Sequence, residues 1–227
     1  VSAHHNRNID LLINAIEELF PTPNKDLKSD FNMNIARSFD INKPGTLPKK
    51  IKGGVLGGTV SIGKIKVGDE IEIRPGRTTK KGLEPITTEV NSLHSGVSRD
   101  SLGPGGLVAI GTSLDPAMTK SDSLIGNVIG KPGTLPPVWD KFSVKTELLD
   151  RVVGTKNIQD MGELKTKEPL MITVGTRTTV GIPITVKEDI VDINLTIPVC
   201  APVGQRIALS RRVDGKWHLI GYGIIQE

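Results

Sequence analysis

One segment of the chain places its apolar residues at the spacing of an α-helix. These residues share one helical face: Ile9, Leu12, Ile13, Ile16, Leu19 and Phe20. We predict a helix over residues 9–20, capped by Asn8, with Asp10 at the positive end of its macrodipole and Pro21 at its end. Because an isolated helix of about a dozen residues is marginal in water, its apolar face must pack against something else.

From residue 34 onward, short runs alternate apolar and polar positions as β-strands do. The chain's 25 Gly and 15 Pro indicate many turns between these runs. Strands are predicted in the first half at 34–41, 59–62, 65–73, 85–93, 107–112 and 123–129, and in the second half at 141–149, 169–174, 181–186, 189–197, 205–213 and 217–225. Asp214-Gly215 predicts a hairpin between the last two, because a type I′ turn needs positive φ at both central positions.

Residues 130–137, Gly-Lys-Pro-Gly-Thr-Leu-Pro-Pro, interrupt the strand pattern. A segment so rich in Gly and Pro sustains neither a helix nor a central strand, so we place a domain boundary here. The predicted domains are residues 1–25, 26–137 and 138–227. The two larger ones are each predicted to be all-β, and the pattern alone does not distinguish a barrel from a sandwich.

Composition narrows the function only slightly. A net charge of +4 and a pI of about 9.1 fit an RNA partner and an ordinary basic protein equally well. Because aromatic residues make up only 3% of the chain, RNA binding would rest on backbone electrostatics rather than on base stacking. The single cysteine, Cys200, excludes an internal disulfide and is predicted to be buried. We find no membrane span or signal peptide and expect a cytoplasmic protein.

No group of residues predicts catalysis. Residues 53–59 are glycine-rich but lack the Lys of a phosphate loop, so we interpret them as a bulged or tightly turned strand corner. Asp-Ser-Leu-Gly at 100–103 matches the short Asp-x-x-Gly pattern of GTPases, but without a phosphate loop we interpret this four-residue match as chance. The adjacent His4 and His5 lack further metal ligands, and the other histidines accompany no recognisable nucleophile. We expect no catalytic residue, no metal site and no cofactor in this chain.

Two groups of basic residues are candidate contacts to RNA phosphates or to the carboxylates of a partner, although such groups are often only solvated. Neighbouring residues of a strand point to opposite faces, so only one of Arg211 and Arg212 is expected to join a given patch. The candidates are Arg74, Arg77, Lys80 and Lys81 in the first half, and Arg206, Arg211, Arg212 and Lys216 in the second.

Longer motifs resemble a known family. Residues 52–58 (KGGVLGG) and 63–73 (GKIKVGDEIEI) are similar to the second-domain signature of translational GTPases, and most similar to the gamma subunit of archaeal and eukaryotic translation initiation factor 2. Four further stretches resemble that subunit specifically: 37–45, 104–112, 208–212 and 217–223. Residues 126–139 resemble its archaeal form more than its eukaryotic form. The resemblance extends over essentially the whole chain.

The resemblance implies a GTPase domain followed by two β-barrels. This chain would hold the barrels, preceded by a remnant in which Ser2 and Ala3 end the last guanine-contacting motif and 9–20 is the final helix. The chain begins with Val, in what resembles the end of a strand, and we interpret this as a sign of a fragment. Because the other GTPase motifs are absent, we expect no GTP hydrolysis by this chain. GTP and magnesium would belong to the intact parent.

The resemblance also implies partners. The intact, GTP-bound factor delivers methionyl initiator tRNA to the small ribosomal subunit, and residues 26–137 would form a wall of the groove for the aminoacylated end and dock the alpha subunit. Residues 138–227 would support the assembly and contact RNA, and the beta subunit would bind the missing GTPase domain. Glycines allow the tRNA end to approach the backbone. The expected groove residues are Gly105, Gly106, Leu107, Val108, Gly111 and Thr112. The alternative is a scaffold for the alpha subunit with negligible tRNA binding.

Overall fold

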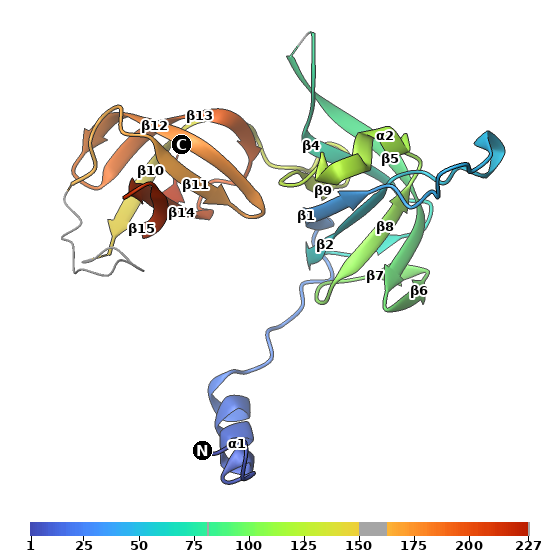
Figure 1. The fold of residues 1–227 in the computed structure, drawn as a ribbon, viewed down its shortest axis with the longest axis horizontal. Coiled ribbons are helices and arrows are strands. Elements are labelled where there is room, and N and C mark those ends of the chain that lie inside the picture. Colours follow the sequence, from blue (N-terminus) through green and yellow to red (C-terminus); the bar gives the residue numbers. More distant parts are fainter. Residues whose placement is uncertain (81, 150–162, 227) are drawn as a thin grey trace.

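The computed structural model describes residues 1–80, 82–149 and 163–226. Two β-barrels lie next to each other, and the N-terminal helix stands apart from both (Figure 1). This arrangement confirms the prediction of two consecutive all-β domains and shows that both are barrels. Within the described ranges, no helix combines the length and the apolar character needed to cross a membrane.

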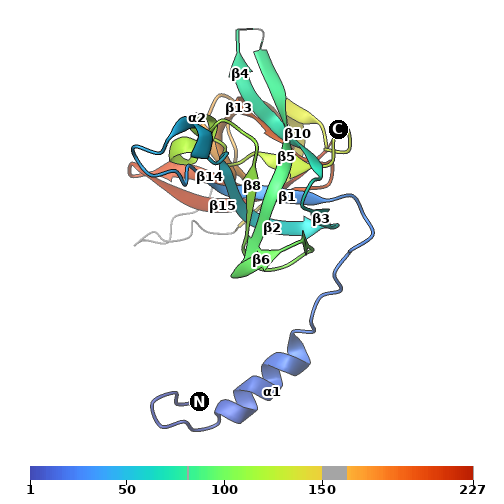
Figure 2. The same cartoon turned by 90° about the vertical axis from the view of Figure 1, so that its right-hand side faces the viewer.

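The N-terminal helix α1 (Ile9–Leu19) confirms the predicted helix. The predicted cap is wrong: Asn8 occupies the N-cap position with a left-handed φ of 57°, and its side chain makes no capping hydrogen bond. The apolar face is open to solvent, since Leu19 and Phe20 are each 72% exposed. Figure 2 shows α1 well away from both barrels, so the expected packing partner of this face is not found in the described part of the chain.

The first barrel is closed by six strands in the order β4-β9-β1-β2-β8-β5, with β5 pairing back to β4. Its core is a single buried cluster that includes Met33, Ile35, Leu56 and Ile110. The elements of this domain are β1 (Asn32–Phe39), the 3₁₀ helix η1 (Pro48–Lys50), β2 (Val55–Ile62), β3 (Ile65–Lys66), β4 (Glu70–Thr79), β5 (Gly82–Ser95), β6 (Val97–Arg99), β7 (Ser101–Leu102), β8 (Val108–Thr112), α2 (Pro116–Thr119), the 3₁₀ helix η2 (Lys120–Asp122) and β9 (Val128–Gly130).

Three strand predictions in this barrel need correction. The strand predicted at 65–73 is divided into β3 and β4 by a turn in which Asp69 N–H donates to the Lys66 carbonyl at 3.2 Å. Residues 55–59 belong to the continuous strand β2 rather than to a tightly turned corner, but the pairing is irregular as a bulge would make it: the register of β1 shifts between Ile35 and Arg37, opposite Gly58 and Gly57. A Cβ on Gly58 would lie 2.1 Å from the Asn34 carbonyl, so glycine permits close strand packing. The last predicted strand begins only at Val128, because α2 and η2 precede it.

The second barrel closes in the order β10-β13-β12-β11-β14-β15. Its strands are β10 (Val138–Leu148), β11 (Leu170–Val174), β12 (Arg177–Lys187), β13 (Ile190–Cys200), β14 (Arg206–Val213) and β15 (Lys216–Ile225). All six overlap a predicted strand. The predicted hairpin between β14 and β15 is confirmed, since Asp214 and Gly215 have φ values of 49° and 80°. Alternating residues of all strands, such as Val144, Ile172 and Ile193, fill the interior.

The turn between β11 and β12 contacts the first barrel. The Thr176 hydroxyl donates to the Ile35 carbonyl at 2.8 Å, and Gly126 N–H donates to the same oxygen at 3.0 Å. Residues 131–137 connect the barrels, and beside them Cys200 packs with Val128 and Leu135 in a small buried cluster. The burial of Cys200 is therefore confirmed. Contacts from two separate segments fix the barrels against each other.

Candidate functional site

The loop between β7 and β8 exposes backbone at one end of the first barrel. Gly105 and Gly106 have φ values of 103° and 74°, and the next side chain, Leu107, is 80% exposed. Gly105 N–H donates to the Val60 carbonyl at 3.3 Å, which attaches the loop to β2. Two successive left-handed residues strongly favour glycine, so the sequence produces a stretch of backbone without side-chain cover. We call Gly105, Gly106 and Leu107 the glycine rim.

Neighbouring residues leave the glycine rim open. A Cβ on Gly106 would meet only the Ser95 hydroxyl, at 3.9 Å, and one on Gly105 would meet only the end of Lys25, whose Nζ lies at 3.5 Å. Val97, the first residue of β6 and the partner of Ser95 across the turn, is 55% exposed. Exposed backbone at the rim thus has a lysine ammonium group and apolar side chains nearby.

The other three predicted groove residues lie in the body of β8. Val108 is buried in the core, and a Cβ on Gly111 would lie 2.4 Å from the Ser92 hydroxyl. Thr112 is 1% exposed, and its hydroxyl donates to the Gly54 carbonyl at 2.7 Å and accepts from Leu114 N–H at 3.2 Å. The structure therefore brings three of the six predicted residues to the surface and gives Val108 and Thr112 positions in the interior.

The predicted guanine-motif remnant lies apart from this loop. Ser2 and Arg7 exchange two backbone hydrogen bonds of 3.1 and 3.0 Å, which enclose Ala3 in a small turn before α1. Because α1 stands away from both barrels, Ser2 and Ala3 are not brought near the glycine rim.

The basic candidates of the first barrel differ in availability. Arg74 Nε lies 2.6 Å from Glu72 Oε1, and Glu72 also accepts from Gly133 N–H at 2.7 Å. Burial alone raises the pKa of Glu72, but the hydrogen bonds from Gly133 and Arg74 outweigh it and leave that pKa below its usual value. Arg74 is thus engaged inside the domain. Arg77 and Lys80 are exposed on the hairpin of β4 and β5, and Lys81 lies outside the described residues.

In the second barrel, the two neighbouring arginines face opposite ways as predicted. Arg211 Nε lies 2.6 Å from Glu168 Oε1 with only 14% of its side chain exposed, while Arg212 is exposed. The Arg206 guanidinium lies 4.2 Å from the centre of the Tyr222 ring, and Lys216 is exposed at the hairpin. Sequence reasoning missed the pairing of Arg211, because Glu168 is far away along the chain.

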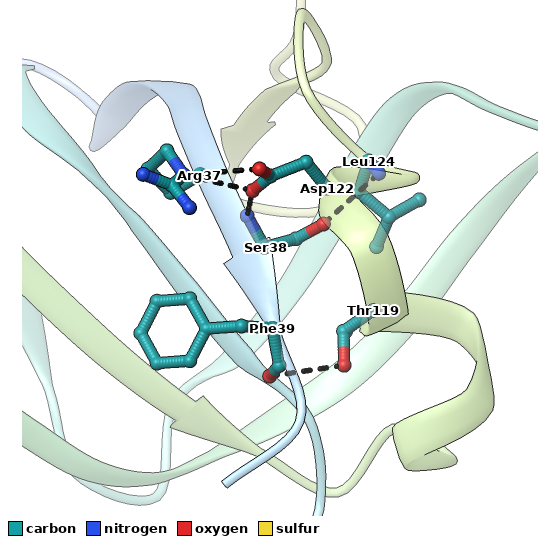
Figure 3. Close-up of polar contacts among 6 residues, drawn as sticks. All are labelled: Arg37, Ser38, Phe39, Thr119, Asp122 and Leu124. Atoms are coloured by element: carbon teal, nitrogen blue, oxygen red, sulfur yellow. Dashed lines mark hydrogen bonds and ion pairs between the residues drawn. The ribbon is translucent and has the colours of Figure 1, made fainter.

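A second exposed loop, which the sequence did not single out, is held by a polar cluster at the end of β1 (Figure 3). Asp122 accepts from Arg37 Nε and from Ser38 N–H, both at 2.9 Å. The Ser38 hydroxyl accepts from Leu124 N–H at 3.1 Å, and the Thr119 hydroxyl donates to the Phe39 carbonyl at 3.2 Å. The hydrogen bond from Arg37 is the main cause that lowers the pKa of Asp122. These contacts fix the point at which the chain leaves the barrel.

Beyond this cluster, residues 40–52 form the exposed loop. Asn42 and Lys52 pair across its base, with Lys52 N–H donating to Asn42 Oδ1 at 2.8 Å and Asn42 Nδ2 donating to the Lys52 carbonyl at 2.7 Å. Its apolar side chains point to solvent: Ile41, Leu47 and Ile51 are 47%, 63% and 48% exposed. The sequence signal that could have identified this surface is a loop that contains Pro and Gly and also carries apolar residues. We call residues 40–52 the docking loop.

Comparison with known proteins identifies the family. Residues 140–225 match the family model described as "Initiation factor eIF2 gamma, C terminal". The whole chain is 51% identical to translation initiation factor 2 subunit gamma of Methanocaldococcus jannaschii and 53% identical to that of Archaeoglobus fulgidus, covering 56% and 54% of those proteins. The chain thus spans about half the length of the curated relatives it matches.

The solved structure of translation elongation factor SelB from Methanococcus maripaludis, in complex with the GTP analogue GppNHp, shares the fold. Its TM-score is 0.72 at 20% identity, covering all of this chain and 50% of that one, so this likeness concerns the fold alone. The sequence identity to archaeal relatives extends over the entire chain. Together with the family model matched by the second barrel, it supports the identification of this chain as a C-terminal part of translation initiation factor 2 subunit gamma.

Proposed function

We propose that this chain supplies the aminoacyl-end wall and the alpha-subunit docking surface of an initiation factor 2 gamma subunit. The intact factor, with GTP bound, would deliver methionyl initiator tRNA to the small ribosomal subunit in the cytoplasm. GTP and magnesium would be bound by the GTPase domain of the parent, which would also hold the beta subunit. The two barrels bind rather than catalyse.

The observation that carries this proposal is the glycine rim. Residues 105–107 are exposed and their backbone has no side-chain cover, so the ester and ribose of a terminal aminoacyl-adenosine can approach it within hydrogen-bond distance. Gly105 N–H is already bonded to the Val60 carbonyl, so the remaining backbone groups of the rim would make these contacts. Exposed Leu107 offers an apolar contact to the methionyl side chain, whose transfer from water is favourable. A bare tRNA end lacks the ester and this side chain, which gives the rim a means of discrimination.

The docking loop would hold the alpha subunit. Three exposed apolar side chains on a loop fixed at its base by the Asn42–Lys52 pair form a pre-ordered contact, so little conformational entropy is lost on binding. This surface also supports the alternative function, a scaffold that binds the alpha subunit and contributes little to tRNA affinity.

Two matched glycine substitutions test these roles. Gly106→Val and Gly45→Val both place a side chain at a left-handed glycine, with φ of 74° and 82°, where a Cβ meets no atom closer than 3.9 Å. The variants are introduced into a reconstituted full-length gamma subunit with alpha subunit and GTP. Binding of methionyl initiator tRNA and of deacylated tRNA is then measured by filter binding at several salt concentrations, and alpha binding by pull-down.

Gly106→Val is expected to reduce the preference for aminoacylated tRNA while alpha binding is retained. Gly45→Val, which lies in the docking loop, is expected to weaken alpha binding while the preference for aminoacylated tRNA is unchanged. Equal discrimination by wild type and Gly106→Val would exclude the groove assignment. If the chain retains the alpha subunit but binds no tRNA at any salt concentration, the scaffold function is the correct one for this chain.

A further inference from the structure

A cavity of about 310 Å³ lies where the hairpin of β4 and β5 meets the second barrel. Its polar lining comes from both domains: Arg77, Thr78 and Ser123 belong to the first barrel, and Arg177 begins β12 of the second. Among the described residues, no carboxylate lines it. Two arginines from different barrels therefore line one space without a negative side chain beside them.

The position of Arg177 is fixed by close packing. A Cβ on Gly126 would lie 2.8 Å from Cα, Cβ and Cδ of Arg177, so the arginine side chain passes directly over a glycine that leaves room for it. The preceding residue, Thr176, is bonded to the Ile35 carbonyl at 2.8 Å. The guanidinium of Arg177 is thus delivered to the cavity by a rigid turn rather than by a flexible surface chain.

One donor of Arg177 lacks a partner. Its Nε is buried and has no hydrogen-bond partner among the described residues, and partial burial lowers the pKa of its guanidinium. Arg74 is half-buried like Arg177, but its Nε is paired with Glu72. Leaving the buried Nε of Arg177 without an acceptor costs free energy in the empty protein.

The nearby carboxylates do not compensate this charge. Asp122, which precedes Ser123, is committed to Arg37 and to Ser38 N–H. Glu84 lies opposite Arg77 in the register of β4 and β5, outside the lining of the cavity. The described lining of the cavity therefore carries two positive side chains and no negative one, and an anion would supply an acceptor for Arg177.

We propose that the Arg77–Arg177 cavity binds a phosphate group, carried either by an RNA backbone or by a free anion. The planar guanidinium of arginine matches a phosphate with two parallel hydrogen bonds, and the exposed Thr78 adds a neutral hydroxyl donor. The Ser123 hydroxyl is not available as a donor, because it donates to the Met118 carbonyl. This site is separate from the glycine rim: Leu83 lines the cavity near the start of β5, whereas Ser95, beside Gly106, ends that strand.

The test compares the 227-residue chain with Arg177→Gln and with Arg99→Gln. Arg99→Gln is the matched control, since it removes the same charge from an exposed position of β6 outside the cavity and outside the two groups of basic candidates. Melting temperatures are measured by circular dichroism in HEPES buffer with and without inorganic phosphate. Phosphate should raise the melting temperature of the wild type and of Arg99→Gln but not of Arg177→Gln, because a ligand stabilises only the folded state that binds it.

The stability of the empty protein separates a binding role from a structural one. Arg177→Gln should melt at or above the wild-type temperature without phosphate, because the substitution removes an uncompensated charge. Arg77→Gln, at an exposed position that does not threaten folding, should also lose the response to phosphate. The proposal is overturned if phosphate shifts the melting temperatures of all four proteins equally, or if Arg77→Gln and Arg99→Gln respond alike.

A fluorescein-labelled oligouridylate identifies the source of the phosphate. If RNA supplies it, Arg177→Gln should weaken binding of the oligonucleotide and reduce the salt slope of log K by about 1, whereas Arg99→Gln retains the wild-type slope. Binding of inorganic phosphate with no effect of Arg177→Gln on oligonucleotide binding would assign the site to a small free anion.

Discussion

Replacing Thr112 by Val removes one hydroxyl from the first barrel at nearly constant volume. Thr112 is 1% exposed, and its hydroxyl both donates to the Gly54 carbonyl at 2.7 Å and accepts from Leu114 N–H at 3.2 Å. The Gly54 carbonyl keeps a second donor, Thr112 N–H at 3.0 Å, so it remains paired in the variant. Leu114 N–H keeps none and is left buried without an acceptor.

The expected cost follows from these two groups. The lost donation to Gly54 is worth about 1 kcal/mol, and an orphaned buried N–H costs about 1–3 kcal/mol. The new methyl group recovers about 0.8 kcal/mol through burial. Thr112→Val should therefore lower the free energy of unfolding of the first barrel by about 1–3 kcal/mol. Thr112→Ser, which keeps both hydrogen bonds and loses one methyl, should cost about 1 kcal/mol.

The chain provides separate signals for its two barrels. Both tryptophans, Trp139 and Trp217, lie in the second barrel, so fluorescence reports its unfolding alone, whereas far-ultraviolet circular dichroism reports both. In urea, Thr112→Val should move the midpoint of a circular dichroism transition to lower concentration. If the barrels unfold independently, the fluorescence midpoint of Thr112→Val should equal that of the wild type. If the fluorescence and circular dichroism midpoints move together, the barrels unfold as one unit, coupled by contacts such as that of Thr176 with Ile35.

An unchanged circular dichroism midpoint in Thr112→Val would refute the structural role derived for this hydroxyl. The same variant bears on the groove, because a buried Thr112 contributes through the fold alone. Discrimination between aminoacylated and bare tRNA in the reconstituted factor should therefore stay at its wild-type value under conditions in which Thr112→Val is folded. A selective loss of discrimination at unchanged stability would place the hydroxyl in the groove.

Two further predictions concern single titratable groups. Tyr222 is the only tyrosine, and the hydrogen bond from its hydroxyl to the Glu147 carboxylate raises its pKa, so the absorbance titration at 295 nm should move to lower pH in Glu147→Gln. The contribution of the raised pKa to stability is complete below about pH 10 and is lost as the pH rises through the folded pKa. An unchanged titration in Glu147→Gln would contradict the bond. Burial raises the pKa of Cys200 to about 11, so Ellman's reagent should react with it slowly at pH 8 in the folded protein and rapidly in urea, while equal rates would show that the thiol is open.

Short-range patterns identified most of the elements. The alternation in the second barrel predicted all six strands, and Asp214-Gly215 predicted the last hairpin, because side-chain direction and turn geometry are local properties. Predictions failed where a local pattern had two solutions. Glycines at 57–58 are compatible either with a corner or with two strands in close contact. The Asn34 carbonyl, from the neighbouring strand β1, leaves no room for a Cβ at Gly58, so close strand contact is the reason for glycine here. Asn8 has the chemistry of a cap, but its left-handed backbone directs the side chain elsewhere.

The sequence by itself determined the β class, the helix, the family resemblance and the Gly-Gly-Leu segment of the rim. Only the tertiary structure decided which predicted residues face solvent. It buried Val108 and Thr112 behind the rim and paired Arg74 and Arg211 with carboxylates. It also joined Arg77 and Arg177, from separate barrels, around one cavity. The physical reason is that exposure and charge pairing depend on contacts between residues distant in sequence. Closure of the barrels and their junction create those contacts, and no local pattern specifies them.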